Sequence, residues 1–251
     1  MLRNVVFEQA RPAATAPGRV DVALFVGFCA PRQDRSGAAL APVNAPVLLD
    51  AWGDFDRRFA WDERRYTNDP DRPIVGGTYL GAAVRSFFVQ GGRRCYVVAV
   101  DAPGPLTDAY ADRRSRIDRL IPGFDSGFPT FSPVEAATWR SAWWLWDLPD
   151  VSFLCLPDLA DVLRADPKDE ELDDEAPLSL PPEQFVDCSV VEAPPLEDVR
   201  SRLISAPRLD EVGYVAWARA VRMLGLFLRR YRADVQLVAR CLSPWPICRP
   251  A

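Results

Sequence analysis

Residues 78–100, TYLGAAVRSFFVQGGRRCYVVAV, constrain the fold more than any other part of the chain. Thr78 is a favoured N-cap residue, and the apolar side chains after it recur at helical spacing. The pair Gly91-Gly92 predicts the end of this helix, because glycine adopts the left-handed conformation of helix C-termini without steric cost. Residues 95–100 then form an apolar run of strand length that is rich in valine. We therefore predict a helix, a tight turn and a buried strand.

Other apolar runs extend this unit into an α/β fold. Residues 21–28 are apolar without alternation, which is typical of a strand covered on both faces. A strand, a helical crossover and a second strand in this order predict parallel pairing. Further short strands are predicted at residues 47–49, 151–156, 184–191 and 234–240. We expect a mixed, largely parallel sheet flanked by helices, with an extended N-terminal arm and loop insertions.

Helices are predicted between these strands, and several carry start signals. We expect Asp50 to cap a helix over 51–59, and residues 159–163 to form a short helix. The sequence of 108–120 mixes arginine and aspartate, which indicates a solvated face or a subunit contact. The longest helix spans 209–232. Its predicted buried stripe consists of Tyr214, Trp217, Val221, Leu224, Leu228 and Tyr231.

A tryptophan-rich helix is predicted over residues 133–146. Ser132, Pro133 and Glu135 form a capping box with proline at its favoured position. The helix carries four tryptophans: Trp139, Trp143, Trp144 and Trp146. Four indoles around one helix do not fit a single core face, so we expect at least one in an interface. A platform for stacking carbohydrate is the alternative.

The chain divides into an arm and one core domain. Residues 1–20 are predicted to be the arm, in which Val5, Val6 and Phe7 are suited to adding a strand to a neighbouring sheet. Residues 21–251 are predicted to be the core domain. Within it, 105–147 is expected to be a helical and loop insertion, and 165–182 an acidic surface loop.

Composition excludes several kinds of chemistry. The chain has no histidine, which removes Ser-His-Asp triads, Cys-His dyads and histidine-ligated metals. Its six cysteines form no CxxC pair, so reduced and buried thiols are expected. Gly76-Gly77 lacks the spacing of a phosphate-binding loop, and the acidic run 165–182 lacks EF-hand spacing. We therefore predict no catalytic residue, no cofactor and no metal.

Charge and hydropathy narrow the partners and the compartment. The net charge of −5 argues against a nucleic-acid binder, which needs a basic face to neutralise phosphates. No apolar run reaches the length of a membrane span. The first residues, MLRNVVFEQARP, lack the apolar stretch of a secretory signal. We expect a cytoplasmic protein without a membrane span.

Three segments, in order, resemble the tail-sheath proteins of contractile phages and related injection systems. The sequence AAVRSFFVQGGRRCYVVAV resembles the sheath signature of an aromatic helix end, a Gly-Gly turn, basic residues and a CYVVRV-like strand. Residues 22–28 are similar to the first core strand of a sheath. Residues 44–59, NAPVLLDAWGDFDRRF, are similar to the sheath segment NxPVLVTSWxDFxRRFG. The matches cover residues 20–100 and contain no catalytic motif.

This resemblance implies a structural role. Sheath subunits stack in helical rings around an inner tube, and contraction comes from their rearrangement. The implied partners are other sheath or sheath-like subunits, with inner-tube, baseplate or cap proteins as further candidates. The C-terminal tube-binding domain of sheath proteins is not recognisable in this sequence, so we expect a short sheath-like protein, assembled into a phage-tail-like particle or virion tail.

The expected interface residues follow from these features, and two other functions stay open. The candidates are Val5, Val6, Phe7, Arg93, Arg94, Arg113, Arg116, Trp143, Trp144 and Trp146. One alternative is an enzyme that uses the strand-end carboxylates Asp101, Asp150 and Asp158. The other is a soluble binding module with the tryptophan-rich helix as its platform.

Overall fold

A computed structural model describes residues 21–67, 74–166 and 208–239. The predicted arm, most of the acidic loop, the strand expected at 184–191 and the C-terminal tail lie outside these residues. The elements in chain order are β1 (Ala23–Gly27), β2 (Pro46–Leu49), α1 (Trp52–Arg58), β3 (Arg64–Arg65), β4 (Val75–Gly76), α2 (Tyr79–Val89), β5 (Cys95–Ala99), α3 (Tyr110–Arg114), α4 (Ile117–Leu120), the 3-10 helices η1 (Ala136–Thr138) and η2 (Ser141–Asp147), β6 (Phe153–Cys155), α5 (Leu159–Leu163), α6 (Glu211–Tyr231) and β7 (Gln236–Val238).

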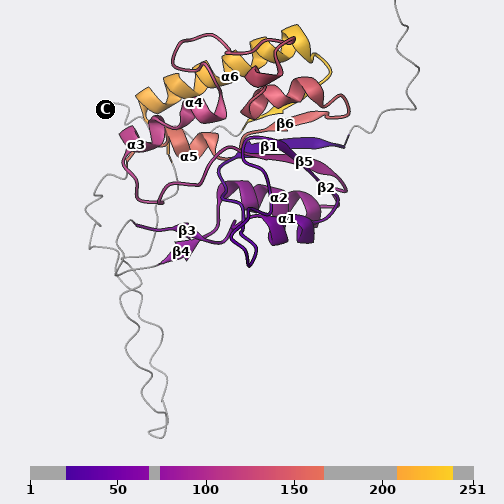
Figure 1. The fold of residues 1–251 in the computed structure, drawn as a ribbon. Coiled ribbons are helices and arrows are strands. Elements are labelled where there is room, and N and C mark those ends of the chain that lie inside the picture. Colours follow the sequence, from indigo (N-terminus) through magenta and orange to yellow (C-terminus); the bar gives the residue numbers. More distant parts are fainter. Residues whose placement is uncertain (1–20, 68–73, 167–207, 240–251) are drawn as a thin grey trace, which may run out of the picture.

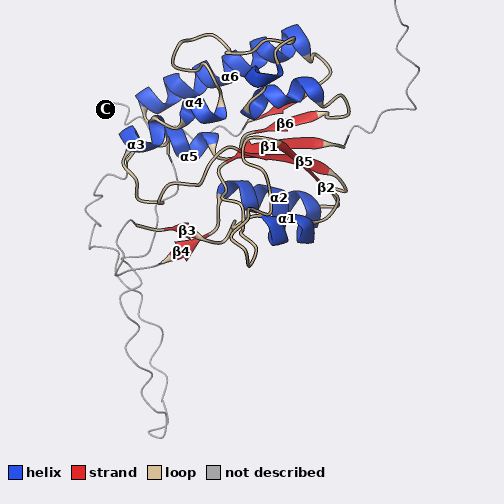
Figure 2. Cartoon of the chain, in the orientation of Figure 1, coloured by secondary structure: helices blue, strands red, loops and turns tan. Residues whose placement is uncertain are grey.

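Five strands form one sheet in the order β2-β5-β1-β6-β7. The pairs of β1 with β5, β1 with β6 and β6 with β7 are parallel, and β2 is antiparallel to β5. Helices lie on both sides of this sheet (Figures 1 and 2). The predicted α/β class, with a mixed and largely parallel sheet, is therefore confirmed.

Every residue of β1 is buried, as its unbroken apolar sequence predicts. Its side chains alternate between two separate cores. Ala23 and Phe25 pack with Leu80 of α2 and Phe55 of α1 on one face. Leu24 and its neighbours on the other face pack with α4, η2 and α6.

The helix-turn-strand unit at 78–100 is formed as the sequence predicts. The hydroxyl of Thr78 accepts a hydrogen bond from the amide of Gly81 at 3.0 Å and caps α2. Gly91 has φ +94°, and its amide donates to the carbonyl of Phe88 at 3.1 Å. The chain then enters β5 directly beside β1.

Two predictions about helices are wrong: the cap of α1 and the single helix at 108–120. Asp50 does not cap α1, because its carboxylate instead accepts from Nε of Arg94 at 2.8 Å. The helix expected at 108–120 is split into α3 and α4. The split lets the Arg113 guanidinium enter a buried ionic network while Ile117 packs into the core. The hairpin of β3 and β4 was not predicted from the polar sequence around it.

The α-helix predicted at 133–146 is also wrong, since the segment forms η1 and η2 instead. Arg140 between them is extended, and Ser141 has φ +52°. The indole of Trp143 donates to the carbonyl of Pro122 at 3.1 Å, and that of Trp144 to the carbonyl of Asn44 at 2.7 Å. These hydrogen bonds to separate parts of the chain outweigh the local helix signals.

The buried face of α6 is rotated from the predicted stripe. Tyr214 is exposed, whereas Gly213 and Ala220 are buried. A side chain at Gly213 would meet the carbonyl of Leu163 at 2.4 Å, so this glycine allows α6 to approach α5 closely. The resulting buried set is Gly213, Ala220, Met223, Leu224, Phe227 and Leu228.

Candidate functional site

In open α/β sheets, ligands bind at the carboxyl ends of the strands, where successive connections turn to opposite faces. In this sheet that point lies between β1 and β6. The connection after β1 leads to α1 and α2 on one face, whereas the connection after β6 leads to α5 and α6 on the other. Here Asp158 fills the crevice: its carboxylate accepts from the amide of Phe28 at 3.0 Å. A side chain at Gly27 would meet this carboxylate at 2.2 Å, so glycine is required for the approach.

Asp158 is 1% exposed, and burial raises its pKa to about 7. The hydrogen bond from Phe28 and the charge of Arg64 act in the opposite direction, whereas the charge of Asp161 raises the pKa further. The group can therefore hold a proton near neutral pH. The carboxyl group that holds this proton lies between the ends of β1 and β6.

A buried ionic network continues from this point along α5. Asp161 accepts from Nη2 of Arg64 at 2.7 Å and from Nε of Arg164 at 2.9 Å. Arg64 also donates to the carbonyl of Gly104 at 2.8 Å, and Arg164 to that of Leu106. The network therefore fastens the loop after β5 to α5 and β3. The Nη1 atom of Arg64 is buried and has no hydrogen-bond partner in the part of the chain that the structure describes.

Arg113 and Arg116 extend this network, which corrects the expectation of a solvated face or a subunit contact at Arg113. Arg113 is 1% exposed and donates to the carbonyl of Arg164 at 2.7 Å and to Asp166 at 3.0 Å. Burial, with the charge of Arg164, lowers the pKa of Arg113. Arg116 is half-buried and pairs with Asp108 at 2.6 Å. Arg113 is thus an internal anchor and presents no outer surface.

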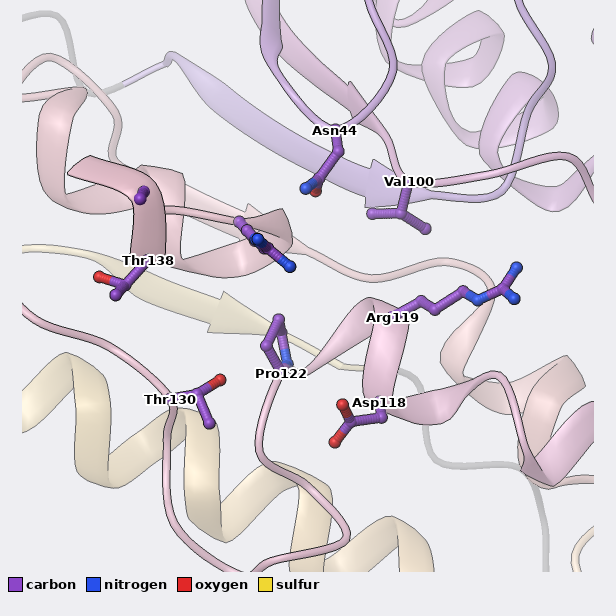
Figure 3. A pocket seen from close by; sticks show the side chains of 9 residues that line it. Asn44, Val100, Asp118, Arg119, Pro122, Thr130 and Thr138 are labelled. Atoms are coloured by element: carbon purple, nitrogen blue, oxygen red, sulfur yellow. The ribbon is translucent and has the colours of Figure 1, made fainter. Parts of the chain in front are cut away.

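Figure 3 shows a hollow beside the carboxyl end of β5. Its volume is about 450 Å³. It is lined by Asn44, Val100, Asp118, Arg119, Pro122, Thr130, Ala137, Thr138 and Arg140. Most of its polar groups already have partners within the chain. Arg119 pairs with Asp101, and the Asp118 carboxylate accepts from the amide of Gly123 at 3.0 Å. Arg140 is exposed and has no side-chain partner among the described residues, so its charge is available to an outside anion.

The three candidate carboxylates do not come together. Asp150 precedes β6 and accepts from the Tyr96 hydroxyl at 3.3 Å, at the opposite edge of the sheet from Asp158. Asp101 follows β5, pairs with Arg119 and accepts from the amide of Ala102 at 2.7 Å. Each carboxylate has its own partners, so the geometry supplies no acid-base pair from these residues.

The tryptophans do not form a shared platform. Trp143 is fully buried, with its ring 4.5 Å from that of Phe227. Trp144 is half-buried, whereas Trp146 is 36% exposed and lies edge-on to Tyr231. Of the three tryptophans among the interface candidates, only Trp146 therefore offers an open surface.

The remaining interface candidates lie at the turn before β5 or in the arm. Arg93 is exposed and has no partner among the described residues, whereas Arg94 pairs with Asp50. Val5, Val6 and Phe7 lie outside the residues that the structure describes. Arg93 is thus the basic candidate most available for contact.

Several residues that organise the molecule were missed from the sequence. Arg64, Asp161, Arg164 and Arg232 are all buried and charged. Arg232 donates to the carbonyls of Leu145, Leu148 and Val151, the last at 2.9 Å. No local pattern distinguishes them from surface arginines, because their partners are up to 97 positions away. The one available signal was the almost exclusive use of arginine over lysine.

The cysteines of the described region are free thiols. Cys29 and Cys95 are buried and Cys155 is half-buried, and burial raises the pKa of each to about 12. They are therefore protonated and weakly nucleophilic, as small apolar side chains of the core are.

Among residues 21–67, 74–166 and 208–239, no group of three or more acidic, cysteine or histidine side chains is placed to hold a metal. No helix in the same part of the chain has the length and hydrophobicity needed to cross a bilayer. Comparison with protein-family models gives no match, and neither does comparison with curated proteins.

Proposed function

We propose that the chain is a sheath-like structural subunit of a contractile tail or contractile injection system, acting by subunit packing. One observation carries the proposal. The three segments that resemble sheath proteins fold into neighbouring elements: β1, the unit of β2 and α1, and the unit of α2 and β5. They share one apolar core, which contains Phe25, Phe55 and Leu80. The resemblance therefore concerns a contiguous part of the fold, built around one core.

The edges of the sheet supply surfaces for this packing. Among the described residues, β7 pairs with β6 alone, and its Val238 is 49% exposed. An edge strand presents unpaired backbone groups to a partner strand. In the proposed assembly, Val5, Val6 and Phe7 of one subunit add a strand to the sheet of a neighbour. The exposed Arg93 supplies a charged contact at the turn before β5.

Co-production with the gene products encoded beside this chain tests the proposal. We expect light scattering after size exclusion to show the chain in a complex much larger than its own 28.0 kDa. Arg93→Glu is expected to reduce the share of chain in that complex, whereas Arg35→Glu, at an exposed arginine that likewise has no side-chain partner among the described residues, serves as the matched control. A chain that elutes as a monomer beside all these products contradicts the proposal.

The enzyme alternative receives no specific support from the geometry, since Asp101, Asp150 and Asp158 do not converge. The binding-module alternative likewise lacks its platform, because Trp143 is buried in the core. The structural role is therefore the function that the arrangement supports best.

A further inference from the structure

An open apolar groove runs along the end of α6, and we call it the α6 groove. It has a volume of about 600 Å³ and is lined by Phe128, Pro129, Phe131, Leu226, Phe227, Arg229, Arg230 and Tyr231. Phe128 and Leu226 belong to the apolar floor of the groove. They are 77% and 55% exposed, so the floor faces solvent. Surfaces that bind other proteins are enriched in aromatic residues and arginine, and this groove contains both.

The wall of this groove is firmly built. The Phe131 ring lies edge-on to those of Phe227 and Tyr231, each at 5.1 Å between centroids. Arg219 holds the same loop to α6 by donating to the carbonyl of Phe124 at 2.8 Å. The exposed Phe128 thus belongs to a segment that is packed and hydrogen-bonded, and the groove is a fixed feature of the surface.

The charged rim of the groove is uncompensated. Arg229 and Arg230 are exposed, and neither has a carboxylate partner among the described residues. The Arg230 guanidinium lies over the Tyr231 ring, 5.2 Å from its centroid. Two positive charges next to an apolar floor match an acidic segment that carries an apolar residue.

The chain itself contains such a segment. Residues 169–175 read DEELDDE, in which Leu172 has three carboxylates on each side. The protein as a whole has a net charge of −5, and this run holds the densest part of its negative charge. We propose that the α6 groove binds residues 169–175 of a second copy of this chain, with Leu172 on the aromatic floor and its flanking carboxylates on Arg229 and Arg230.

The length of the chain favours a second copy over the same molecule. The amide of Ala165 donates to the carbonyl of Arg208 at 2.9 Å, so the chain leaves the described fold beside the beginning of α6. Arg229 lies about 27 Å further along this helix at about 1.5 Å per residue. Extended chain spans at most about 3.6 Å per residue, so Asp169 reaches about 14 Å from Ala165 and Glu171 about 22 Å. Leu172 reaches at most about 25 Å, so it approaches its own groove only when residues 165–172 are almost fully extended, whereas a second copy carries no such requirement.

This inference rests on the proposed packing of subunits and adds one specific contact to it. A labelled peptide of residues 166–180, titrated into the full chain and followed by fluorescence anisotropy, tests it directly. We expect saturable binding that weakens as salt is raised from about 50 to 500 mM, because salt screens exposed charges. Arg229→Glu/Arg230→Glu is expected to weaken binding at least about tenfold.

Matched variants separate the groove from general charge effects. Arg35→Glu/Arg222→Glu makes the same charge change at exposed positions outside the groove and is expected to change affinity less than about twofold. Leu226→Asp alters the floor while both arginines remain, and it is expected to weaken binding like the peptide change Leu172→Ser. Circular dichroism verifies that each variant is folded.

The outcomes distinguish this contact from the proposed function. No saturable binding by the folded full chain, or equal losses in the two charge-reversed variants, overturns the docking of residues 169–175. Assembly with the neighbouring gene products would survive that result. Conversely, peptide binding with the expected variant pattern supports the contact even where no large complex forms.

Discussion

The two faces of the sheet are held by different means. On the face covered by α1 and α2, apolar and aromatic side chains such as Phe55 and Leu80 form the core. On the face covered by α4, η2 and α6, the apolar core is supplemented by arginines that bind backbone carbonyls. Arg232 binds the segment after η2, and Arg219 binds the loop after α4.

This difference follows from local structure. The α1–α2 face consists mainly of regular helices and strands, which satisfy most of their own backbone groups. The other face contains 3-10 helices and loops, such as η2, whose carbonyls need donors from elsewhere. A guanidinium supplies several donors from one side chain, which suits this task better than the single ammonium of lysine. The comparison predicts distinct responses to mutation on the two faces.

The largest effect is expected on the arginine-supported face. Arg232→Met removes the guanidinium that donates to the carbonyls of Leu145, Leu148 and Val151, and we expect a loss of about 4 kcal/mol in the free energy of unfolding. Urea denaturation measures this loss. Arg232→Lys restores little, because one ammonium does not span these carbonyls. Arg230→Met is the exposed control, and a loss in Arg232→Met no larger than in the control would refute this explanation.

On the α1–α2 face, the loss in the free energy of unfolding is expected to depend on the side-chain volume that a substitution removes. Leu80→Ala removes a fully buried side chain and leaves a cavity, so we expect a loss of about 3 kcal/mol. Leu80→Met keeps the volume and should cost less than about 1.5 kcal/mol. A small loss of stability in Leu80→Met beside a large loss in Arg232→Met is the pattern that separates the two faces. Similar losses for Leu80→Ala and Leu80→Met would contradict it.

A smaller effect is expected from Asp158, which lies between the two faces. Its pKa is raised from 3.8 to about 7 by burial, so the folded state holds a proton that the unfolded state releases between these values. Folding stability from this group is therefore greatest below about pH 4 and falls as the pH rises to about 7. Relative to wild type, Asp158→Asn should gain at least about 1 kcal/mol between pH 4 and pH 8. Parallel pH profiles for the two proteins would exclude this assignment.

The smallest effect is expected at the start of α2. Thr78→Ala removes the acceptor for the Gly81 amide and should cost about 1 kcal/mol, as measured by thermal unfolding. Thr78→Ser retains that acceptor and should recover most of the stability. If serine and alanine are equally destabilising, the cap is not the source of the effect.

The sequence predicted the unit at 78–100 well and the segment around η1 and η2 poorly, for one physical reason. At Thr78 and Gly91 the decisive interactions lie within a few residues, so local preferences identify them. At Trp143 and Trp144 the decisive hydrogen bonds go to Pro122 and Asn44. Such distant contacts overrode a capping box that was complete in the sequence.

The candidate site was predicted only in part. Asp158 was identified as a strand-end carboxylate, and its position at the carboxyl end of β6 agrees with that prediction. Its burial and its contact with Phe28 depend on the parallel pairing of β1 and β6. Arg64 and Asp161 meet from distant parts of the chain, and no spacing rule connects them.

Negative-stain electron microscopy of the chain, produced together with the gene products encoded beside it, tests the central proposal most directly. A sheath-like subunit predicts ordered rings or tubes that contain this chain in a regular repeat. A dispersed monomer in the presence of all these products, with rings or tubes that form equally well without it, would contradict a role in subunit packing.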